Sequence, residues 1–407
     1  MKQARIIVGA NYGDCGKGTI VANYTKAAVL RGDRVLNVLT NGGSQRGHSI
    51  ITDTGDSHTF KHFGSGLVYG ADTLFSEYYI VNPMQFQKER YEHNVNVYLV
   101  YMHKDCKWST PYDALYNMCI EHARGKDRHG TCAMGIWHTI ERYETFAKRT
   151  LSFQEFVGFC ANMPELAMDY LKTIRAYYDA KGVPFVDEDT EVAWKSDSMM
   201  EHFMQDCIHM YNKVITIDDD WEALNLYDEV IFENGQGLQL MNMGKRSTPS
   251  NTGIFDAMQI LSGFTNVSLH YVTRPYVTKH GYGSFNNEQD KKFIASDIKE
   301  DRTNHYNEWQ GDFRFGKLDL NDLSNRLYRD YNKYEKLYQT NFSKTLELTH
   351  CDEMDRVNEC KTAIPNFKVN TYATAKVWWL WYKMGTAQKE WWWFLYDNRQ
   401  AVVVRTF

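Results

Sequence analysis

The sequence predicts an α/β fold: a large, mostly parallel central sheet flanked by helices, in a P-loop-NTPase-like topology with helical insertions. Three observations support this prediction. The chain has 407 residues, enough for a large buried core. Its first segments follow the order strand, loop, helix and strand, which is typical of a right-handed crossover between parallel strands. Further apolar runs along the chain are typical of buried strands in the same sheet.

The first two strands and the helix between them are the clearest elements. Residues 4–13 ("ARIIVGANYG") form an apolar run that ends in glycine, which predicts a buried strand. Apolar side chains then recur at roughly helical spacing in residues 17–32, and Gly32 can end this helix. Residues 34–43 ("RVLNVLTNGG") predict the second strand.

The rest of the chain is expected to extend the same domain. Further strands are predicted within residues 94–102, 229–237, 266–277 and 345–354. Residues 140–215 have a helical pattern and are interpreted as an insertion. The charged region 286–335 is expected to form loops, with a helix near 320–334. With no convincing linker or repeat, residues 1–407 are interpreted as one domain, with a divergent aromatic-rich C-terminal segment at 360–407.

Composition excludes several classes of function. The formal net charge is −5, so no basic face is expected and nucleic acid is not an expected partner. The eight cysteines form no CxxC pair, which argues against a zinc ribbon and fits a reducing cytosol. The longest aromatic run is far shorter than a membrane span. We therefore expect a cytoplasmic protein with no membrane partner.

The loop after the first strand has the ingredients of a phosphate site. In "GANYGDCGKGTIV" (residues 9–21), Lys17 is followed by Gly18, so the segment is neither a Walker A loop nor a GxGxxG motif. Gly13, Gly16 and Gly18 would nevertheless let backbone N–H groups approach an anion at the start of a helix.

Asp14 is the unusual residue of this loop, because a carboxylate repels phosphate. It fits the loop if it holds Mg²⁺ or removes a proton. The alternative is a glycine-rich turn with a solvated Asp14–Lys17 pair, and composition alone leaves both interpretations open.

A second glycine-rich loop favours the functional interpretation. "NGGSQRGHS" (residues 41–49) follows the second strand, so in a parallel sheet it emerges at the same edge as the first loop. It would bring four residues near Asp14 and Lys17: Gln45, Arg46, Gly47 and His48. A carboxylate and an imidazole that face one pocket can serve as base and acid.

The two loops together resemble a known pair of signatures. "GDCGKG" and "GGSQRGHS" resemble GDEGKGK and GGHNAGHT of the adenylosuccinate synthetase family. Other segments resemble that family's motifs in the same order: "HFGSG" (62–66), "GTCAMGI" (130–136), "FENGQGLQL" (232–240), "TPSNTG" (248–253), "YVTKHGYGSF" (276–285), "GKLD" (316–319) and "LTHCDEMD" (348–355). The resemblance covers residues 9 to about 355.

The resemblance implies a two-step C–N ligation. A nucleoside triphosphate phosphorylates the 6-oxygen of a purine nucleotide, and the amino group of aspartate then displaces that phosphate. Asp14 would take the proton from N1 and His48 would donate to the transferring oxygen and the γ-phosphate. Lys17 would balance phosphate charge, and Gln236 would hold the base or its 6-oxygen.

The resemblance also implies ligand-binding residues. Mg²⁺ would be held by Asp14 and the Gly47 carbonyl. Nucleotide-binding roles are implied for Gly13, Gly16, Gly18, Thr19, Asn41, Gln45, Gly47, Thr131, Arg149, Asn234, Thr252 and Asp352. Among these, Thr131, Thr252 and Arg149 would hold the 5′-phosphate of the substrate. Arg149 would come from a neighbouring subunit, so a homodimer is expected.

The sequence departs from the family at the expected amino-acid site. The family has an arginine-rich loop there, but residues 307–316 read "NEWQGDFRFG". Arg314 remains and is expected to bind the amino acid together with Lys279 and Thr278, with aspartate favoured as the substrate.

The identity of the nucleotides stays open. The family's TKxD motif reads "THCD" (349–352), so both ATP and GTP are candidate phosphoryl donors. These departures resemble phage-type members that convert deoxyguanylate to 2-aminoadenylosuccinate, which favours dGMP or GMP and the cytoplasm of a host. Typical phage-type members have serine at the position of Asp14, so Asp14 instead favours IMP, or a subgroup that keeps the carboxylate with a guanine substrate.

Two alternatives of another kind follow from the sequence. The eroded arginine loop would also fit a catalytically inactive nucleotide-binding protein of the same fold. A simple NTPase is the other alternative, and Gln236 and the second glycine-rich loop argue against it.

Overall fold

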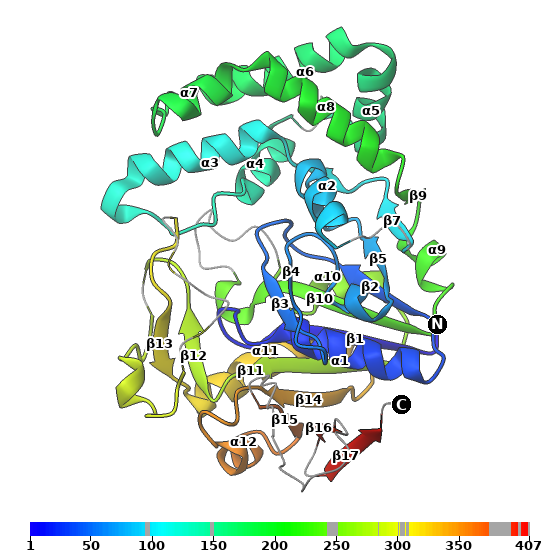
Figure 1. Ribbon diagram of the computed structural model, residues 1–407, viewed down its shortest axis with the longest axis vertical. Coiled ribbons are helices and arrows are strands. Elements are labelled where there is room, and N and C mark those ends of the chain that lie inside the picture. Colours follow the sequence, from blue (N-terminus) through cyan, green and yellow to red (C-terminus); the bar gives the residue numbers. More distant parts are fainter. Residues whose placement is uncertain are drawn as a thin grey trace, which may run out of the picture.

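A nine-stranded sheet runs through the centre of the molecule (Figure 1). The computed structural model describes residues 1–93, 98–146, 150–241, 251–283, 285–299, 301, 306 and 309–373, and the backbone of 392–397 and 400–405. The strand order is β15-β14-β11-β1-β10-β2-β5-β7-β9, and all neighbours are parallel. This confirms the predicted α/β class with a central parallel sheet.

The strands of this sheet are short and mostly buried. They are β1 (Gln3–Gly9), β2 (Val35–Leu39), β5 (Asp72–Phe75), β7 (Val100–His103), β9 (Ile215–Ile217), β10 (Glu229–Gly237), β11 (Val267–Thr273), β14 (Ser343–Leu348) and β15 (Lys368–Thr371). The smaller pairs are formed by β3 (His48–Ile51), β4 (Ser57–Phe60), β6 (Ile80–Val81), β8 (Lys107–Trp108), β12 (Tyr276–Lys279), β13 (Arg314–Lys317), β16 (Trp392–Asp397) and β17 (Gln400–Arg405).

Helices cover the sheet and extend beyond it. They are α1 (Lys17–Leu30), α2 (Pro83–Glu92), α3 (Pro111–Arg124), α4 (Ile136–Phe146), α5 (Phe153–Asn162), α6 (Pro164–Asp179), α7 (Glu188–Lys195), α8 (Asp197–Tyr211), α9 (Asp220–Leu224), α10 (Phe255–Ile260), α11 (Leu320–Tyr338) and α12 (Val357–Ala363). Figure 1 shows α3 to α8 gathered at one end of the molecule. The region expected to be helical, 140–215, contains α5 to α8, and the same group of helices also includes α3 and α4, starting at Pro111.

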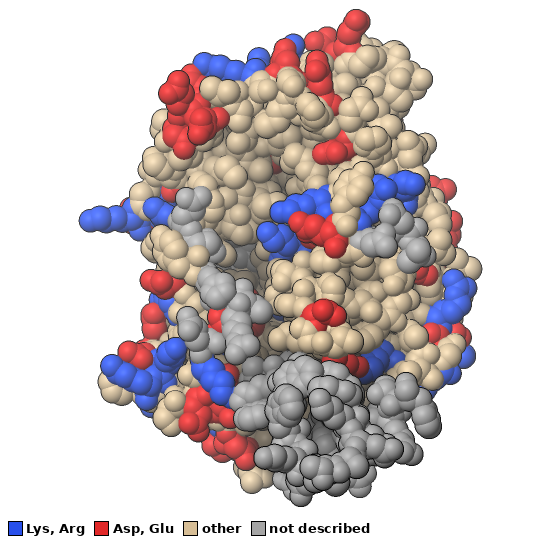
Figure 2. Space-filling view, in the orientation of Figure 1, with Lys and Arg blue, Asp and Glu red and all other residues tan. Residues whose placement is uncertain are grey.

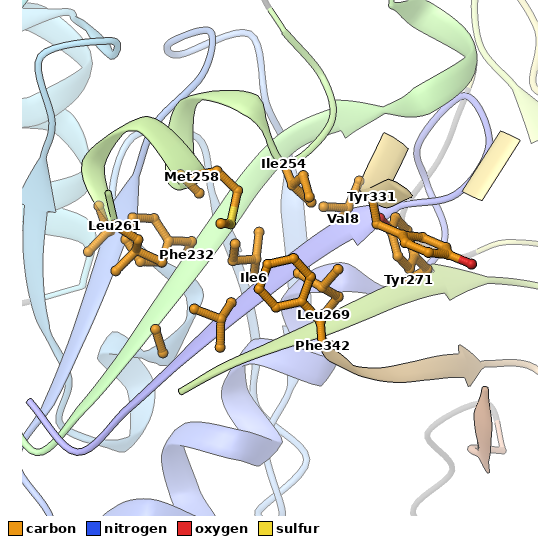
Figure 3. Packing of buried hydrophobic residues seen from close by; sticks show 14 of the residues in the cluster. Ile6, Val8, Phe232, Ile254, Met258, Leu261, Leu269, Tyr271, Tyr331 and Phe342 are labelled. Atoms are coloured by element: carbon orange, nitrogen blue, oxygen red, sulfur yellow. The ribbon is translucent and has the colours of Figure 1, made fainter. Parts of the chain in front are cut away.

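The core explains why β1 is a continuous apolar run. On one face of the sheet, Ile6 and Val8 belong to a cluster that includes Met258 of α10 (Figure 3). On the other face, Ile7 clusters with Ile20 of α1. Because both faces of a parallel sheet are covered, alternating polar residues have no place in such a strand.

The expected strand at 266–277 is divided in the structure. β11 ends at Thr273, and β12 begins at Tyr276 and pairs antiparallel with β13 in a separate hairpin. Pro275 lies between them, and a proline has no N–H group to continue a ladder. The helix expected near 320–334 is confirmed as α11, whereas β5, β9 and β15 were not expected.

Charges of both signs are spread over the surface. On the described part of the face in Figure 2, Lys and Arg are interspersed with Asp and Glu. Within the described residues, no helix is both long and apolar enough to cross a membrane.

Candidate active site

Three segments meet where neighbouring strands of the sheet end. The first glycine loop (residues 10–16) follows β1, the second glycine loop (40–47) follows β2, and both contact the end of β10, which lies between those two strands. Gln239 N–H donates to the carbonyl of Asn11 at 3.0 Å. Gly235 N–H donates to Asn41 Oδ1 at 2.8 Å. The two loops therefore share one edge of the sheet, as expected from the sequence.

The start of α1 lies directly against the second glycine loop. A Cβ atom added at Gly18 would lie 3.1 Å from His48 Cβ, a tight contact that would push the two segments apart by a few tenths of an ångström. The backbone before the helix is left-handed at Gly13, Asp14 and Gly16, with φ values of 114°, 50° and 86°. This backbone conformation brings the N-terminus of the 14-residue helix α1 next to His48.

Lys17 lies buried at the centre of the first glycine loop. It is 3% exposed, and its Nζ lies 4.0 Å from Cys15 Sγ. Among the described residues it forms no salt bridge with a carboxylate. A buried ammonium group without a countercharge is costly, so this position suits an anionic ligand such as a phosphate.

The first glycine loop is held from the opposite side by the ends of β11 and β14. Arg274 Nε donates to the carbonyl of Asp14 at 2.8 Å, and Thr349 Oγ1 donates to the carbonyl of Cys15 at 2.9 Å. Arg326 of α11 donates to the carbonyl of Ala10 and to Asn11 Oδ1, both at 2.8 Å. Three of these four bonds are accepted by backbone carbonyls of the loop, and Asp14 itself is only partly buried.

Several buried polar atoms around the two loops have no hydrogen-bond partner in the described structure. They include Asn41 Nδ2, Gln45 Nε2, His48 Nε2, Gln236 Oε1 and Thr252 Oγ1. Buried polar groups are normally paired, so a cluster of unpaired ones indicates a place for a polar ligand. The opposite ends of two of these side chains are fixed, because Gln45 Oε1 accepts from Gly43 N–H at 2.6 Å and Asn41 Oδ1 accepts from Gly235 N–H.

His48 is oriented by a buried carboxylate that sequence reasoning missed. Its Nδ1 lies 2.5 Å from Glu233 Oε1, and Arg46 Nη2 lies 3.2 Å from Glu233 Oε2. Ser65 completes the set, since its N–H donates to Oε2 at 2.8 Å and its hydroxyl donates to Oε1. Three hydrogen bonds, from His48 and Ser65, and the ion pair with Arg46 thus surround one carboxylate, which makes Glu233 a positioning residue.

The charges of this group follow from burial and contact. Burial alone would raise the pKa of Glu233, but Arg46 and His48 lower that pKa to about 2. Burial, followed by the charge of Arg46, lowers the pKa of His48 to about 4. Glu233 is therefore ionised and accepts a hydrogen bond from Nδ1–H of a neutral His48 ring. In this tautomer Nε2 has no proton and keeps its lone pair.

Asn234 and Thr252 lie together beneath the second glycine loop. Asn234 Nδ2 donates to the carbonyls of Thr252 at 3.2 Å and Gly253 at 2.6 Å, and Thr40 Oγ1 donates to Asn234 Oδ1 at 3.3 Å. The Asn234 amide is thus occupied within the protein and positions Thr252.

Thr131 lies in the loop between α3 and α4. Its hydroxyl accepts from Asn117 Nδ2 at 3.0 Å. The loop packs tightly against the segment after β12, because a Cβ atom at Gly130 would lie 2.6 Å from Gly281 Cα. Thr19 is partly exposed on the first turn of α1, and Arg149 lies outside the described residues.

The three residues expected to bind the amino acid lie on one hairpin. Lys279 of β12 pairs with Arg314 of β13, and Thr278 is buried beside them. Lys279 Nζ donates to the carbonyl of Tyr282 at 2.7 Å and lies 5.3 Å from the Tyr12 ring of the first glycine loop. Burial, followed by the charge of Arg314, lowers the pKa of Lys279 to about 8.

Asp352 lies three residues after Thr349, whose hydroxyl donates to the first glycine loop. Its Oδ2 accepts from Lys299 Nζ at 2.9 Å. The neighbouring His350 has a left-handed backbone with φ 56°, and burial lowers the pKa of its ring to about 3. The carboxylate expected to recognise a base is therefore paired with an ammonium group.

The described part of the site offers few side chains that could bind a metal ion. Among the described residues, no three His, Cys, Asp or Glu side chains gather in a way that could hold a metal ion. Mg²⁺ does not require such a group, because it is commonly bound by one or two carboxylates, water and substrate phosphates. The Asp14 carboxylate and the Gly47 carbonyl are hard oxygen donors that fit this pattern.

The fold and site define an α/β protein in which two glycine-rich loops, a buried lysine and unpaired polar atoms meet at the carboxyl edge of the sheet. The family model for adenylosuccinate synthetase matches residues 6–374. The chain belongs to the adenylosuccinate synthetase family, which confirms the resemblance seen in its motifs.

Curated relatives and solved structures agree with this assignment. The adenylosuccinate synthetase of Pasteurella multocida (strain Pm70) is 30% identical over 302 residues, which cover 71% of this chain and 65% of that protein. The enzyme of Microcystis aeruginosa (strain NIES-843) is 24% identical over 300 residues, covering 70% and 62%. The chain therefore spans less than two thirds of the length of these relatives.

Two solved structures share the fold. Fully ligated adenylosuccinate synthetase from Plasmodium falciparum has a TM-score of 0.62 at 17% identity, covering 87% of this chain and 78% of that one. Cyanophage S-2L succinoaminodeoxyadenylate synthetase, bound to dGMP and to dATP as an energy donor, has a TM-score of 0.59 at 13% identity, covering 92% of both chains.

Proposed function

We propose that the protein is an NTP-dependent ligase that joins an amino acid, with aspartate favoured, to C6 of a 6-oxopurine nucleotide. The observation that carries this proposal is the meeting of the two glycine loops around unpaired, buried polar atoms and the uncompensated charge of Lys17. A purine nucleotide and a triphosphate would supply the acceptors, donors and negative charge that these groups lack.

In the first step, Asp14 removes the proton from N1 of the purine, so that O6 can attack the γ-phosphorus of the triphosphate. The bond from the γ-phosphorus to the bridging oxygen breaks, and the nucleoside diphosphate leaves. Gln236 holds the base or its 6-oxygen. Lys17 and the N-terminus of α1 balance the negative charge that spreads over the phosphates. In the second step, the neutral amine of the amino acid attacks C6, the phosphate leaves with the bonding electrons, and the surplus proton of the nitrogen passes to the departing phosphate.

His48 would act on the transferring phosphoryl group. In the free protein its Nε2 has a lone pair, so it becomes a donor only after taking up a proton. Nearby phosphate charge favours that uptake. Mg²⁺, held by Asp14 and the Gly47 carbonyl, would supply further positive charge to the phosphates when bound.

We favour dGMP or GMP as the purine substrate, supported by the fold shared with a cyanophage protein bound to dGMP. IMP is the alternative, supported by the carboxylate at Asp14. The pairing of Asp352 with Lys299 weakens Asp352 as an acceptor for guanine N–H groups, and this supports ATP over GTP.

The remaining roles carry over from the family resemblance as proposals. Thr131, Thr252 and Arg149 bind the 5′-phosphate, with Arg149 from the second subunit of a homodimer. Gly13, Gly16, Gly18, Thr19, Asn41 and Gln45 line the nucleotide sites. We propose that the protein works in the cytoplasm.

The proposal is tested by a coupled assay with matched variants. IMP, GMP and dGMP are each combined with aspartate and either ATP or GTP, and the products are identified by mass. Asp14→Asn removes the proposed base and is expected to lower kcat by about 10²- to 10⁴-fold, with nucleotide binding retained. Asp33→Asn, an ion-paired aspartate beyond the opposite end of α1, is the control. Full activity in D14N would contradict the role assigned to Asp14.

One observation favours a second candidate, an inactive nucleotide-binding protein of the same fold. Arg314 is already paired with a carboxylate of its own chain, Glu288. Tight nucleotide binding without turnover across a panel of amino acids would support this candidate over the ligase.

A further inference from the structure

Arg314 grips a carboxylate that belongs to its own chain. Its Nε donates to Glu288 Oε1 at 2.7 Å, and its Nη2 donates to Glu288 Oε2 at 2.5 Å. Its Nη1 donates to the carbonyls of Gly281 at 2.9 Å and Gly283 at 3.0 Å. Two parallel bonds between a guanidinium and a carboxylate form the arrangement by which arginine recognises carboxylate ligands.

The backbone, and not only the side chain, places Glu288 beside Arg314. Residues 287–289 run along β13: Gln289 N–H donates to the carbonyl of Phe315 at 2.9 Å, and Lys317 N–H donates to the carbonyl of Asn287 at 3.0 Å. Glu288 itself forms an antiparallel bridge with Gly316. Glu288 is therefore fixed next to the hairpin that carries Arg314.

This pair adjoins the first glycine loop. The Arg314 guanidinium lies 5.4 Å from the ring of Phe285, and Phe285 meets Tyr12 edge to face with ring centroids 5.4 Å apart. Lys279 contacts the same Tyr12 ring. Tyr12 is two residues before Asp14, so Glu288 occupies Arg314 beside the loop that carries the proposed base.

We infer that Glu288 sets the affinity of the amino-acid subsite: its carboxylate occupies Arg314 in the free protein, and the amino-acid substrate binds by displacing it with a carboxylate of its own. The inference rests on the proposed function, which assigns the amino acid to Lys279 and Arg314. Glu288 is thus an internal competitor for an acidic amino acid.

The exposure of the pair makes such an exchange inexpensive. The side chains of Arg314 and Glu288 are 23% and 43% exposed, and partly exposed ion pairs contribute little net stability. One carboxylate replaces another on the same guanidinium, so no hydrogen bond of Arg314 is lost. Because the substrate must first displace Glu288, it binds more weakly than it would to a free Arg314.

The first test is steady-state kinetics with aspartate varied. Glu288→Gln keeps the size of the side chain and removes its charge, so the KM for aspartate should fall about two- to fivefold, the range expected for a partly exposed pair. The kcat and the KM for the purine nucleotide should stay within twofold of wild type. An unchanged or higher KM for aspartate in E288Q would overturn the inference.

The control is a similar arginine–glutamate ion pair at the start of α12. Arg356 donates from Nε and Nη2 to Glu359 Oε2 at 3.0 and 2.6 Å, and the Glu359 side chain is 56% exposed. This pair lies at the start of α12, where Arg356 Nη1 also donates to the carbonyl of Leu318 at 2.8 Å, just after β13. Glu359→Gln therefore removes a similar ion pair without changing Arg314 or Glu288. Its KM for aspartate should equal that of wild type, and an equal fall in both variants would overturn the inference.

A binding experiment separates this inference from the proposed function. Succinate has the two carboxylates of aspartate but no amine, so its binding can be measured by calorimetry without turnover. E288Q should bind succinate about two- to fivefold more tightly than wild type, and Arg314→Ala should lose that binding. Tighter succinate binding in a protein without ligase activity would sustain the inference and refute the ligase. Ligase activity with unchanged succinate binding in E288Q would refute only the inference.

Discussion

At the scale of single residues, the site depends on pairs that are remote in sequence. His48 and Glu233 are separated by 185 positions, and Ser65 and Glu233 by 168. The glycine loops were predicted from local patterns, because loop, glycine and helix are contiguous. Glu233 was not singled out, although a glutamate within the apolar run of residues 229–237 was the available signal. No local pattern could show that its partners would be His48 and Ser65.

His62 gives a prediction about pH. Its ring is fully buried, its Nε2 accepts from Asn82 N–H at 2.8 Å, and burial followed by the charge of Arg46 lowers its pKa to about 3. In the unfolded chain the pKa is about 6.5. Between these values the unfolded ring binds a proton that the folded ring does not, so stability decreases as pH falls from about 6.5 towards 3.

The expected contribution of this one ring has a slope of up to about 1.4 kcal/mol per pH unit. His62→Gln keeps an acceptor for Asn82 N–H and removes the titration, so its free energy of unfolding should fall less steeply between pH 6 and 4. Urea unfolding at several pH values measures this. His202→Gln, at an exposed position on α8, is the control. Equal slopes in H62Q and wild type would contradict the prediction.

At the scale of elements, long apolar segments were predictable and short ones were not. β1, α1, β2, β10 and α11 coincide with expected elements. β5, β9 and β15 have only three or four residues each, so they show no period of their own. These three strands are recognised by their hydrogen bonds to neighbouring strands of the sheet. A local sequence pattern carries no information about such pairing.

The strand β1 carries a prediction about stability. Ile6 is fully buried at the centre of the sheet (Figure 3), so Ile6→Ala should lower the free energy of unfolding by about 2–5 kcal/mol, and Ile6→Val by about 0.5–1.5 kcal/mol. Chemical unfolding measures both. Leu30→Ala, at a side chain that is 78% exposed, should change stability by less than about 0.5 kcal/mol. A similar loss in all three variants would contradict this account of the core.

At the scale of the whole molecule, the fold class and the order of motifs were predictable from sequence. The family model covers residues 6–374, and the central sheet is parallel as expected. The arrangement of the amino-acid subsite was not predictable, because Glu288 reaches Arg314 through strand pairing between segments 26 residues apart. Contacts such as that between Glu288 and Arg314 can be recognised only when the pairing of the strands is known.

Ligand binding should stabilise the whole molecule. A ligand that binds only the folded state at 100 times its dissociation constant adds about 2.7 kcal/mol to stability. ATP with dGMP should therefore raise the Tm by a few degrees, and Lys17→Met should abolish the rise because the buried ammonium group is lost. Lys26→Met, on a later turn of α1, is the control and should respond as wild type. A full shift in K17M would contradict the role of Lys17.

The hydrogen bonds from α11 to the first glycine loop have a practical consequence for shortened forms of the protein. Arg326 reaches Ala10 and Asn11 from more than 300 positions later in the chain. A shortened fragment that keeps both signature motifs but stops before residue 320 would lack the helix that braces them. Such a fragment should not retain nucleotide affinity, however complete its motifs look.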